Sequence, residues 1–303
     1  MLSFSVVLTA QKQVLKLLEY EKDSFTYRIS ETTDFIIKTT TGKEVSREEK
    51  VVDYGFKKLR TKNKQKADHA SFQVKINDIY LEKNDLIDTF QYHHKGNLST
   101  NHQLENGYEK LIDYQFDVLI SPNGKITTAE TFDAVYKKDF GTADIFDNTD
   151  LTIIKKQVKT KFSKKTVEQT MRFFQYLYPI DSIGLQDTWS VIDTLYPEFG
   201  VFSNMTFTLK EVKNNIAFIE IKSILFQGKN FKGLDMDMMH LKFDLKGQQE
   251  GLVLLDLKTG WIRKLTIYQN VNGRMTVFAV DPQGVNLKMQ IKGTTEYDLI
   301  NDY

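Results

Sequence analysis

The most regular feature of this chain is an alternation of apolar and polar residues in short stretches, separated by Gly, Asn and Asp. Because successive side chains of a strand point to opposite faces, this alternation predicts strands with one buried face. The predicted strands are residues 23–29, 34–40, 70–76, 114–120, 205–212, 216–226, 240–247, 251–257, 261–271 and 274–280. The pattern therefore predicts a mainly β protein of antiparallel type.

Turn residues between the predicted strands support antiparallel hairpins. Residues 121–124 are Ser-Pro-Asn-Gly, which places Pro and Gly where a type I turn prefers them. Residues 213–215 and 271–274 contain the Asn and Gly residues that tight hairpins need for positive φ. We therefore expect turns at all three positions.

Two segments depart from the β pattern. Residues 128–140 are compatible with a helix, and residues 163–179 predict one more strongly. In the second segment Ser163 can cap the N-terminus, an apolar stripe runs from Val167 to Leu177, and Pro179 marks the end. This predicted helix lies close to the middle of the chain.

Similar stretches recur in the same order in the two halves of the chain. LISPNGKI at 119–126 resembles LDLKTGWI at 255–262, and DSFT at 23–26 resembles DTWS at 187–190. The shared order predicts an internal duplication, and hence two related antiparallel, curved sheets joined through the central helix. The predicted units are a signal-peptide remnant (1–10), a first β unit (11–150), a connecting segment with the helix (151–180) and a second β unit (181–303).

The N-terminus predicts export. An apolar run ends in Leu8-Thr9-Ala10 and is followed at once by Gln11, which is typical of the end of a secretory signal peptide cleaved after Ala10. The alternative interpretation is an ordinary first strand. No other apolar run approaches the roughly 18 residues that span a membrane. We therefore expect a periplasmic or extracellular protein without a transmembrane segment.

Charge and composition narrow the classes of function. The 303 residues include 41 Lys plus Arg and 40 Asp plus Glu, so the net charge is +1. This balance gives no reason to expect a nucleic-acid partner, and the basic runs at 57–66 and 155–165 are interpreted as solvated surfaces. The chain has no Cys, which excludes thiol catalysis, zinc–thiolate sites and disulfides.

Several of these stretches together carry a family resemblance. DVLISPNGKI with the acidic AETFD (129–133), DSIGLQDTWS (181–190) and GLVLLDLKTGWIRK (251–264) resemble the pattern of a family of secreted bacterial proteins. This is the domain of unknown function numbered 6263, found mainly in the Bacteroidota. The resemblance implies an exported envelope protein of β-rich fold, and it implies no activity and no catalytic residues.

The sequence contains none of the common nucleophile, metal or nucleotide motifs. In a strand, Met236, Met238 and His240 would share one face, and thioethers with imidazole suit Cu(I). We favour the alternative that these methionines pack in a core or line an apolar groove, so no cofactor is expected. His93, His94 and His102 are interpreted as a polar loop rather than a metal site.

These observations predict a non-catalytic protein that binds or carries an apolar or envelope-derived ligand. Two alternatives remain open: a structural or protein-interaction module of the cell envelope, and a hydrolase with dispersed carboxylates. A convergent cleft with a raised carboxyl pKa would favour the hydrolase. The candidate ligand-binding residues are Phe218, Leu225, Phe226, Met236, Met238 and Phe243.

Overall fold

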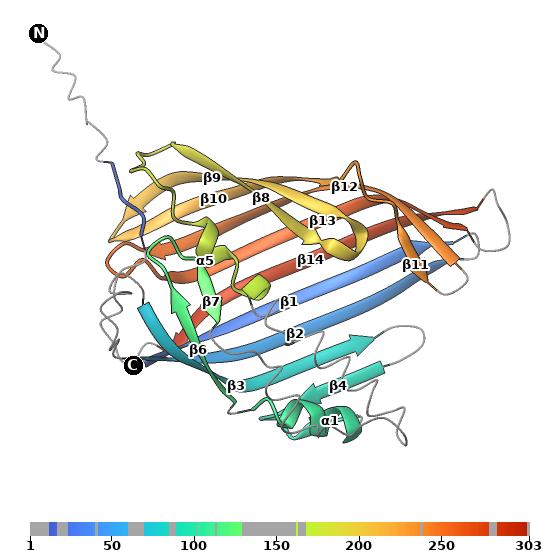
Figure 1. The fold of residues 1–303 in the computed structure, drawn as a ribbon, viewed down its shortest axis with the longest axis horizontal. Helices are drawn as coiled ribbons and strands as arrows, with labels where there is room; N and C mark the ends of the chain where they lie inside the picture. The colour runs from blue at the N-terminus through green and yellow to red at the C-terminus, as the bar shows by residue number, and fades with distance from the viewer. Residues whose placement is uncertain are drawn as a thin grey trace, which may run out of the picture.

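The computed structural model describes residues 12–16, 24–39, 42–59, 70–84, 89–100, 102–112, 114–128, 162, 168–236, 239–278 and 284–301. The first strands, shown in Figure 1, are β1 (Ser24–Lys38), β2 (Lys43–Lys58), β3 (Ala70–Asn84), β4 (Thr89–His93), β5 (Leu98–Ser99), β6 (Gln115–Ile120) and β7 (Ile126–Thr128). The others are β8 (Thr188–Tyr196), β9 (Val201–Lys213), β10 (Ile216–Gln227), β11 (Leu234–Met236), β12 (Met239–Asp256), β13 (Ile262–Phe278) and β14 (Val285–Asn301). The helices are α1 (His102–Glu109), α5 (Phe173–Tyr176) and the 3-10 turn η2 (Pro197–Phe199).

The described strands form a single antiparallel sheet of 14 strands. Its main order is β5-β4-β3-β2-β1-β14-β13-β12-β10-β9-β8, with β6 beside β3, β7 beside β6, and β11 beside β12. Two meanders meet where the first strand pairs with the last, for example Tyr27 with Leu299 and Lys38 with Lys288. The sequence led us to expect two sheets, but this pairing between opposite ends of the chain joins them into one.

The central strands are unusually long. Strands β1, β2 and β3 have 15, 16 and 15 residues, and β12, β13 and β14 have 18, 17 and 17. At about 3.3 Å per residue they extend roughly 50–60 Å, against a usual length of about five or six residues. Consequently the predicted strands 23–29 and 34–40 both overlap β1.

The predicted turn at 271–274 is wrong, because β13 continues through it and Gly273 pairs with Leu245 of β12. A Cβ atom on Gly273 would lie 1.8 Å from the Asp244 carbonyl oxygen, so this glycine allows close approach of two backbones.

The predicted turns at 121–124 and 213–215 are confirmed. Gly124 N–H donates to the Ser121 carbonyl oxygen at 2.8 Å, and Asn214 and Asn215 have φ values of 52° and 61°.

The predicted central helix is described only in part. Residues 163–167 of this helix lie outside the described residues, as do residues 129–140 of the other helix-compatible segment, 128–140. Within the rest of the predicted helix, α5 has four residues and continues the helical turn of residues 168–170. Figure 1 places α5 against the sheet rather than between two sheets.

One face of the sheet, here called the inner face, packs against α5 in a large cluster of buried residues. Trp261 is 1% exposed and lies 4.7 Å from Phe25 and 5.5 Å from Phe174, measured between ring centroids. The Tyr27 hydroxyl donates to the Ile262 carbonyl oxygen at 2.5 Å, so its polar atom is satisfied within the core. The large cluster is therefore an aromatic core covered by the chain itself.

A second, small cluster occupies the same face farther along the strands. Its buried members are Val201, Leu225, Leu245, Val271, Met289 and Ile291. Each lies on a strand that also contributes to the large cluster; on β14, for example, Ile291 belongs to the small cluster and Tyr297 to the large one. The inner face is thus apolar at two places along the length of the same strands.

A belt of polar side chains separates the two clusters. It consists of the buried Ser203, Ser223 and Gln249 and the half-buried Gln269 and Tyr196. The Ser203 hydroxyl lies 2.7 Å from that of Ser223 and donates to Gln249 Oε1 at 2.9 Å. Gln249 Nε2 donates to Gln269 Oε1 at 3.0 Å, and Gln269 Nε2 donates to the Tyr196 hydroxyl at 2.6 Å. Because these groups satisfy one another, the belt can cross the interior at little cost.

The belt continues across β1 and β2 as an ion pair. Lys50 Nζ lies 2.8 Å from Glu31 Oε2, and the side chain of Lys50 is 8% exposed. Burial opposes the charged form of Lys50, but the Glu31 carboxylate outweighs it, and the pKa of Lys50 is raised. A polar line therefore extends from β9 to β2 between the two apolar regions.

Candidate functional site at the open end of the inner face

Beyond the small cluster the inner face stays apolar but is only half covered. Phe243 of β12 pairs with Met275 of β13, which pairs with Leu287 of β14. All three side chains are half-buried, as is Phe35 of β1, which also packs against the small cluster. We call this region the open end of the inner face. It presents accessible apolar side chains on a rigid sheet.

The chain after β8 partly covers this region. The Phe199 ring of η2 lies 5.1 Å from that of Phe243 and 6.2 Å from that of Phe35. The Gln227 side-chain amide donates to the Phe199 carbonyl oxygen at 3.0 Å and holds the turn in place. Gly200 then reverses the chain with φ of 62°, which favours glycine. Phe199 is itself half-buried, so the cover leaves aromatic surface accessible.

Only some of the candidate ligand-binding residues from the sequence lie together in the structure. Leu225 is 1% exposed in the small cluster, and Phe243 packs against that cluster. Phe218 and Phe226 alternate with the buried residues of β10 and therefore point to the opposite, outer face. There Phe226 stacks on Phe202 with 5.9 Å between ring centroids.

The methionine and histidine candidates are described in part. The side chain of Met236 and all of Met238 lie outside the described residues. His240 is described, and its Nδ1 atom lies 2.6 Å from Asp235 Oδ1, an exposed carboxylate. Within the described ranges, no group of three His, Asp or Glu side chains is arranged to hold a metal ion.

Sequence reasoning missed Phe35, Phe199 and Met275. Phe35 and Met275 lie in stretches where apolar and polar residues alternate, and this alternation predicts strands. It does not show which face of the sheet is left partly uncovered. Phe199 lies in Pro-Glu-Phe-Gly, where the Pro and Gly mark a turn ahead of the predicted strand 205–212. The sequence therefore indicates the turn, but it does not show that the turn packs against the sheet.

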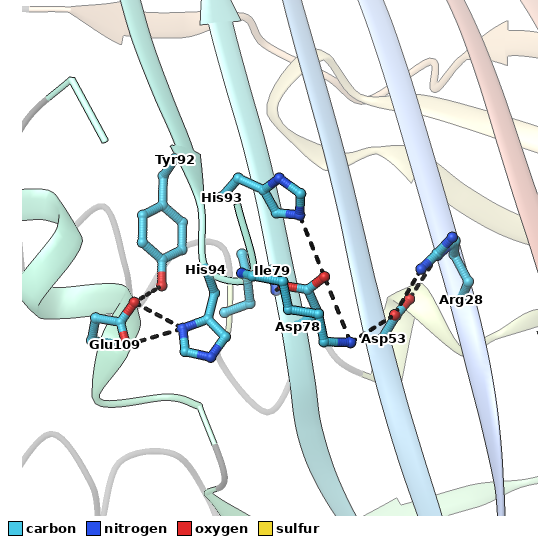
Figure 2. A network of polar contacts seen from close by, with 9 residues as sticks. Arg28, Asp53, Asp78, Ile79, Tyr92, His93, His94 and Glu109 are labelled. Atoms are coloured by element: carbon cyan, nitrogen blue, oxygen red, sulfur yellow. Dashed lines mark hydrogen bonds and ion pairs between the residues drawn. The ribbon is translucent and has the colours of Figure 1, made fainter. Parts of the chain in front are cut away.

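A separate polar network occupies the outer face at the other meander (Figure 2). Asp53 of β2 is 3% exposed, although it points to the outer face between two inward residues. Arg28 of β1 lies opposite it and donates from Nε and Nη2 to its two oxygens at 2.8 and 2.9 Å. Hydrogen bonding to Asp53 raises the pKa of Arg28. The buried carboxylate is therefore paired.

A β-bulge brings a second carboxylate to this network. The register between β2 and β3 shifts after Asp53, so Asp53 pairs with Asp78 and Asn77 is the extra residue. Asp78 Oδ1 accepts the backbone N–H groups of Ile79 at 3.0 Å and Lys95 at 3.2 Å. Lys95 Nζ lies 3.7 Å from Asp53 and 3.8 Å from Asp78. The network thus fixes the turn after β4 onto β1, β2 and β3.

The two adjacent histidines of this turn point to different partners, as Figure 2 shows. His93 Nε2 lies 3.5 Å from Asp78, whereas His94 Nδ1 lies 2.9 Å from Glu109 Oε1 of α1. The Tyr92 hydroxyl also donates to Glu109 at 2.7 Å. Burial opposes the charged form of Glu109, but the hydrogen bonds from His94 and Tyr92 lower its pKa. The side chain of His102 is outside the described residues.

Comparisons with solved structures give weak similarities. A lipovitellin structure titled for its lipid–protein interactions matches with a TM-score of 0.47 and 11% identity. The match covers 93% of this chain and 26% of that one, so this chain spans about a quarter of the lipovitellin chain. OpdQ from Pseudomonas aeruginosa matches with a TM-score of 0.18 and 8% identity over 91% of this chain and 98% of its own.

None of the helices in the described part of the chain has the length and hydropathy to cross a bilayer.

The sequence comparisons give one family. No curated protein matches the chain. The model of a family of unknown function, DUF6263, matches residues 67–262, which include β3, the belt strands β9, β10 and β12, and the start of β13. The family expected from the turn and strand motifs is confirmed, and this chain belongs to the DUF6263 family.

Proposed function

We propose that this protein is exported and binds an apolar or envelope-derived ligand, without catalysis, at the open end of the inner face. The observation that carries the proposal is the half-burial of Phe35, Phe199, Phe243 and Met275 beside a fully buried cluster. Binding sites for small molecules are mostly apolar surfaces built on rigid elements. A ligand that covers these rings would complete the burial that η2 begins.

The electrostatics of the described carboxyls support a non-catalytic function. A general acid at neutral pH needs a carboxyl whose pKa is raised, usually by burial. Glu109 and Glu220 instead have lowered pKa values, Glu220 because Lys222 hydrogen-bonds its carboxylate. Asp53 is buried but is bound by Arg28 on both oxygens. Each of these carboxylates is hydrogen-bonded by side chains beside it, Glu109 by His94 and Tyr92, Glu220 by Lys222 and Asp53 by Arg28.

A protein partner is the second candidate, and the edge of the sheet favours it. Strand β8 ends the strand order, and Ile192 on this strand is 67% exposed. Exposed strand edges can pair with a strand from another chain.

The export proposal is independent of both candidates and rests on residues 1–10, which lie outside the described residues.

Replacing Phe243 by Ala is expected to weaken binding of a fluorescent fatty acid by about tenfold or more, because ring contacts of this size contribute about 1.5–3 kcal/mol. Phe226→Ala is the matched control, since Phe226 is an aromatic residue of a neighbouring strand that points to the outer face. We expect it to change the dissociation constant less than twofold.

The titrations are made on variants whose thermal unfolding remains cooperative, and Phe199→Ala serves as a second inner-face variant. Equal effects of Phe243→Ala and Phe226→Ala, or no saturable binding to the wild type, would contradict the proposed site.

A further inference from the structure

The outer face carries a groove that the proposed function does not use. It has a volume of about 410 Å³ and lies over the ends of β1, β2, β3 and β6. Volumes of about 300–1,000 Å³ are typical of sites for small molecules. Most of its lining side chains point away from the inner face, so the groove is separate from the open end.

Two ladders of paired residues build the groove. In one, Ser24 of β1 pairs with Lys57 of β2, which pairs with Gln73 of β3. In the other, Thr26 pairs with Gly55, which pairs with Lys75. The second ladder continues from Lys75 to Gln115 of β6. All seven positions alternate with buried residues of the large cluster, so the two ladders share the outer face.

The hollow results from a glycine opposite the β-bulge. Gly55 has no side chain to fill the surface between Thr26 and Lys75. A Cβ atom at Gly55 would lie 2.6 Å from the Nδ2 atom of Asn77, the extra residue of the bulge. Glycine within a strand often marks such a close approach. The bulge and the glycine therefore shape the groove together.

The lining has the chemistry of an anion and hydroxyl receptor. Lys57 and Lys75 are diagonal neighbours on β2 and β3, about 7–8 Å apart at the backbone, so both ammonium groups can reach one ligand. The amides of Gln73, Asn77 and Gln115 can donate to or accept from hydroxyl groups. Among the described residues that line the groove, none is acidic.

The aromatic residues of the lining do not offer a stacking surface. Phe25 and Phe56 contribute backbone to the groove, while their rings stack on each other in the large cluster, 5.0 Å apart. A neutral sugar would therefore lack the ring contact that usually holds it, and charge must supply the affinity. We propose that this groove binds an acidic saccharide of one or two units through Lys57 and Lys75.

The test is isothermal titration calorimetry of the full chain at low salt with digalacturonate, glucose 6-phosphate, cellobiose and inorganic phosphate. We expect saturable binding of the sugar anions and none of cellobiose. Lys57→Gln and Lys75→Gln together should weaken binding roughly a hundredfold, about tenfold for each charge-assisted hydrogen bond. The relative affinities for digalacturonate and glucose 6-phosphate distinguish a carboxylate from a phosphate as the anionic group.

Three further variants make the test specific. Lys43→Gln with Lys213→Gln changes the net charge equally at exposed strand ends and should leave binding within twofold. Gly55→Ala should weaken binding by pushing Asn77 into the groove with both lysines intact. Asp117→Asn should strengthen binding a few fold. Asp117 of β6 is exposed and pairs with Gln73 of β3, so its negative charge opposes an anionic ligand in the groove.

Cooperative thermal unfolding of each variant establishes that it is folded. Absence of saturable binding of both sugar anions, or an equal loss in the Lys43 and Lys213 control, would overturn the proposal. Inorganic phosphate that binds as tightly as the sugar anions would overturn the saccharide assignment.

Discussion

Replacing Trp261 by Ala is expected to lower the free energy of unfolding by about 4 kcal/mol, a value within the usual range for replacing a buried Trp by Ala. Trp261 is 1% exposed and lies at the centre of the large cluster. Its ring is within 6.2 Å of the rings of Phe25, Tyr27, Phe56, Phe72 and Phe174, measured between centroids. These residues come from β1, β2, β3 and α5, so the cavity would weaken contacts across both meanders.

Trp189 provides the matched control. It lies on the edge strand β8, is half-buried, stacks on Phe207 at 5.4 Å and donates its indole N–H to the Tyr176 carbonyl oxygen at 2.8 Å. Trp189→Ala should cost about 2 kcal/mol, because part of the ring is already in water. Urea unfolding followed by circular dichroism measures both values. A Trp261→Ala cost no greater than that of Trp189→Ala would contradict the central place of Trp261.

The second large effect concerns the ion pair in the polar belt. Glu31→Gln leaves the buried Lys50 ammonium without its carboxylate and should destabilise the protein by about 2 kcal/mol. This value is below the usual cost of breaking a buried pair, because Glu31 is 35% exposed and its charge is partly screened. Glu49→Gln is the matched control. Glu49 is 32% exposed and lies 3.8 Å from the exposed Arg47, so we expect less than about 0.5 kcal/mol.

The same pair gives a pH dependence with a defined sign. The folded-state pKa of Lys50 is raised above 10.5, so its stabilisation is complete below that pH. It is lost as the pH rises through the folded-state value. Buried tyrosines, such as Tyr54 with its pKa raised by burial to about 12, also lose protons in this range. We therefore compare wild type with Glu31→Gln by urea unfolding at pH 8 and pH 11. The difference between them should shrink at pH 11, and a constant difference would contradict the assignment.

Local features of the fold were predictable because local chemistry determines them. The alternation in residues 205–212 and 216–226 predicted β9 and β10, and Asn214 and Asn215 predicted the turn between them. The pairing of β1 with β14 was not predictable, because it joins opposite ends of the chain and leaves no local signal. The number of sheets depends on that single pairing.

The candidate site was predictable only in part for a related reason. In residues 216–226 both faces of the strand carry apolar side chains, so alternation alone could not decide between Leu225 and Phe226. Packing decides it: Leu225 joins the small cluster and Phe226 is 39% exposed on the outer face. The outer groove depends on the bulge at Asn77 facing Gly55, which requires the register of two strands.

The two turns that resemble each other in sequence, at 119–126 and 255–262, belong to different surroundings. The first joins β6 and β7, of six and three residues, beside β3. The second joins β12 and β13, of 18 and 17 residues, in the body of the sheet. The duplication stays a prediction, and the two hairpins share a turn without sharing strand length or neighbours.

Native mass spectrometry of the protein purified from the cells that produce it tests the central claim most directly, with mild release and identification of anything bound. The proposed function predicts a stoichiometric apolar molecule, which is lost when Phe243 is replaced by Ala and retained when Phe226 is replaced. A clean mass of the protein alone would contradict ligand binding. If a second protein were also purified with it, the edge strand β8 would become the site to study.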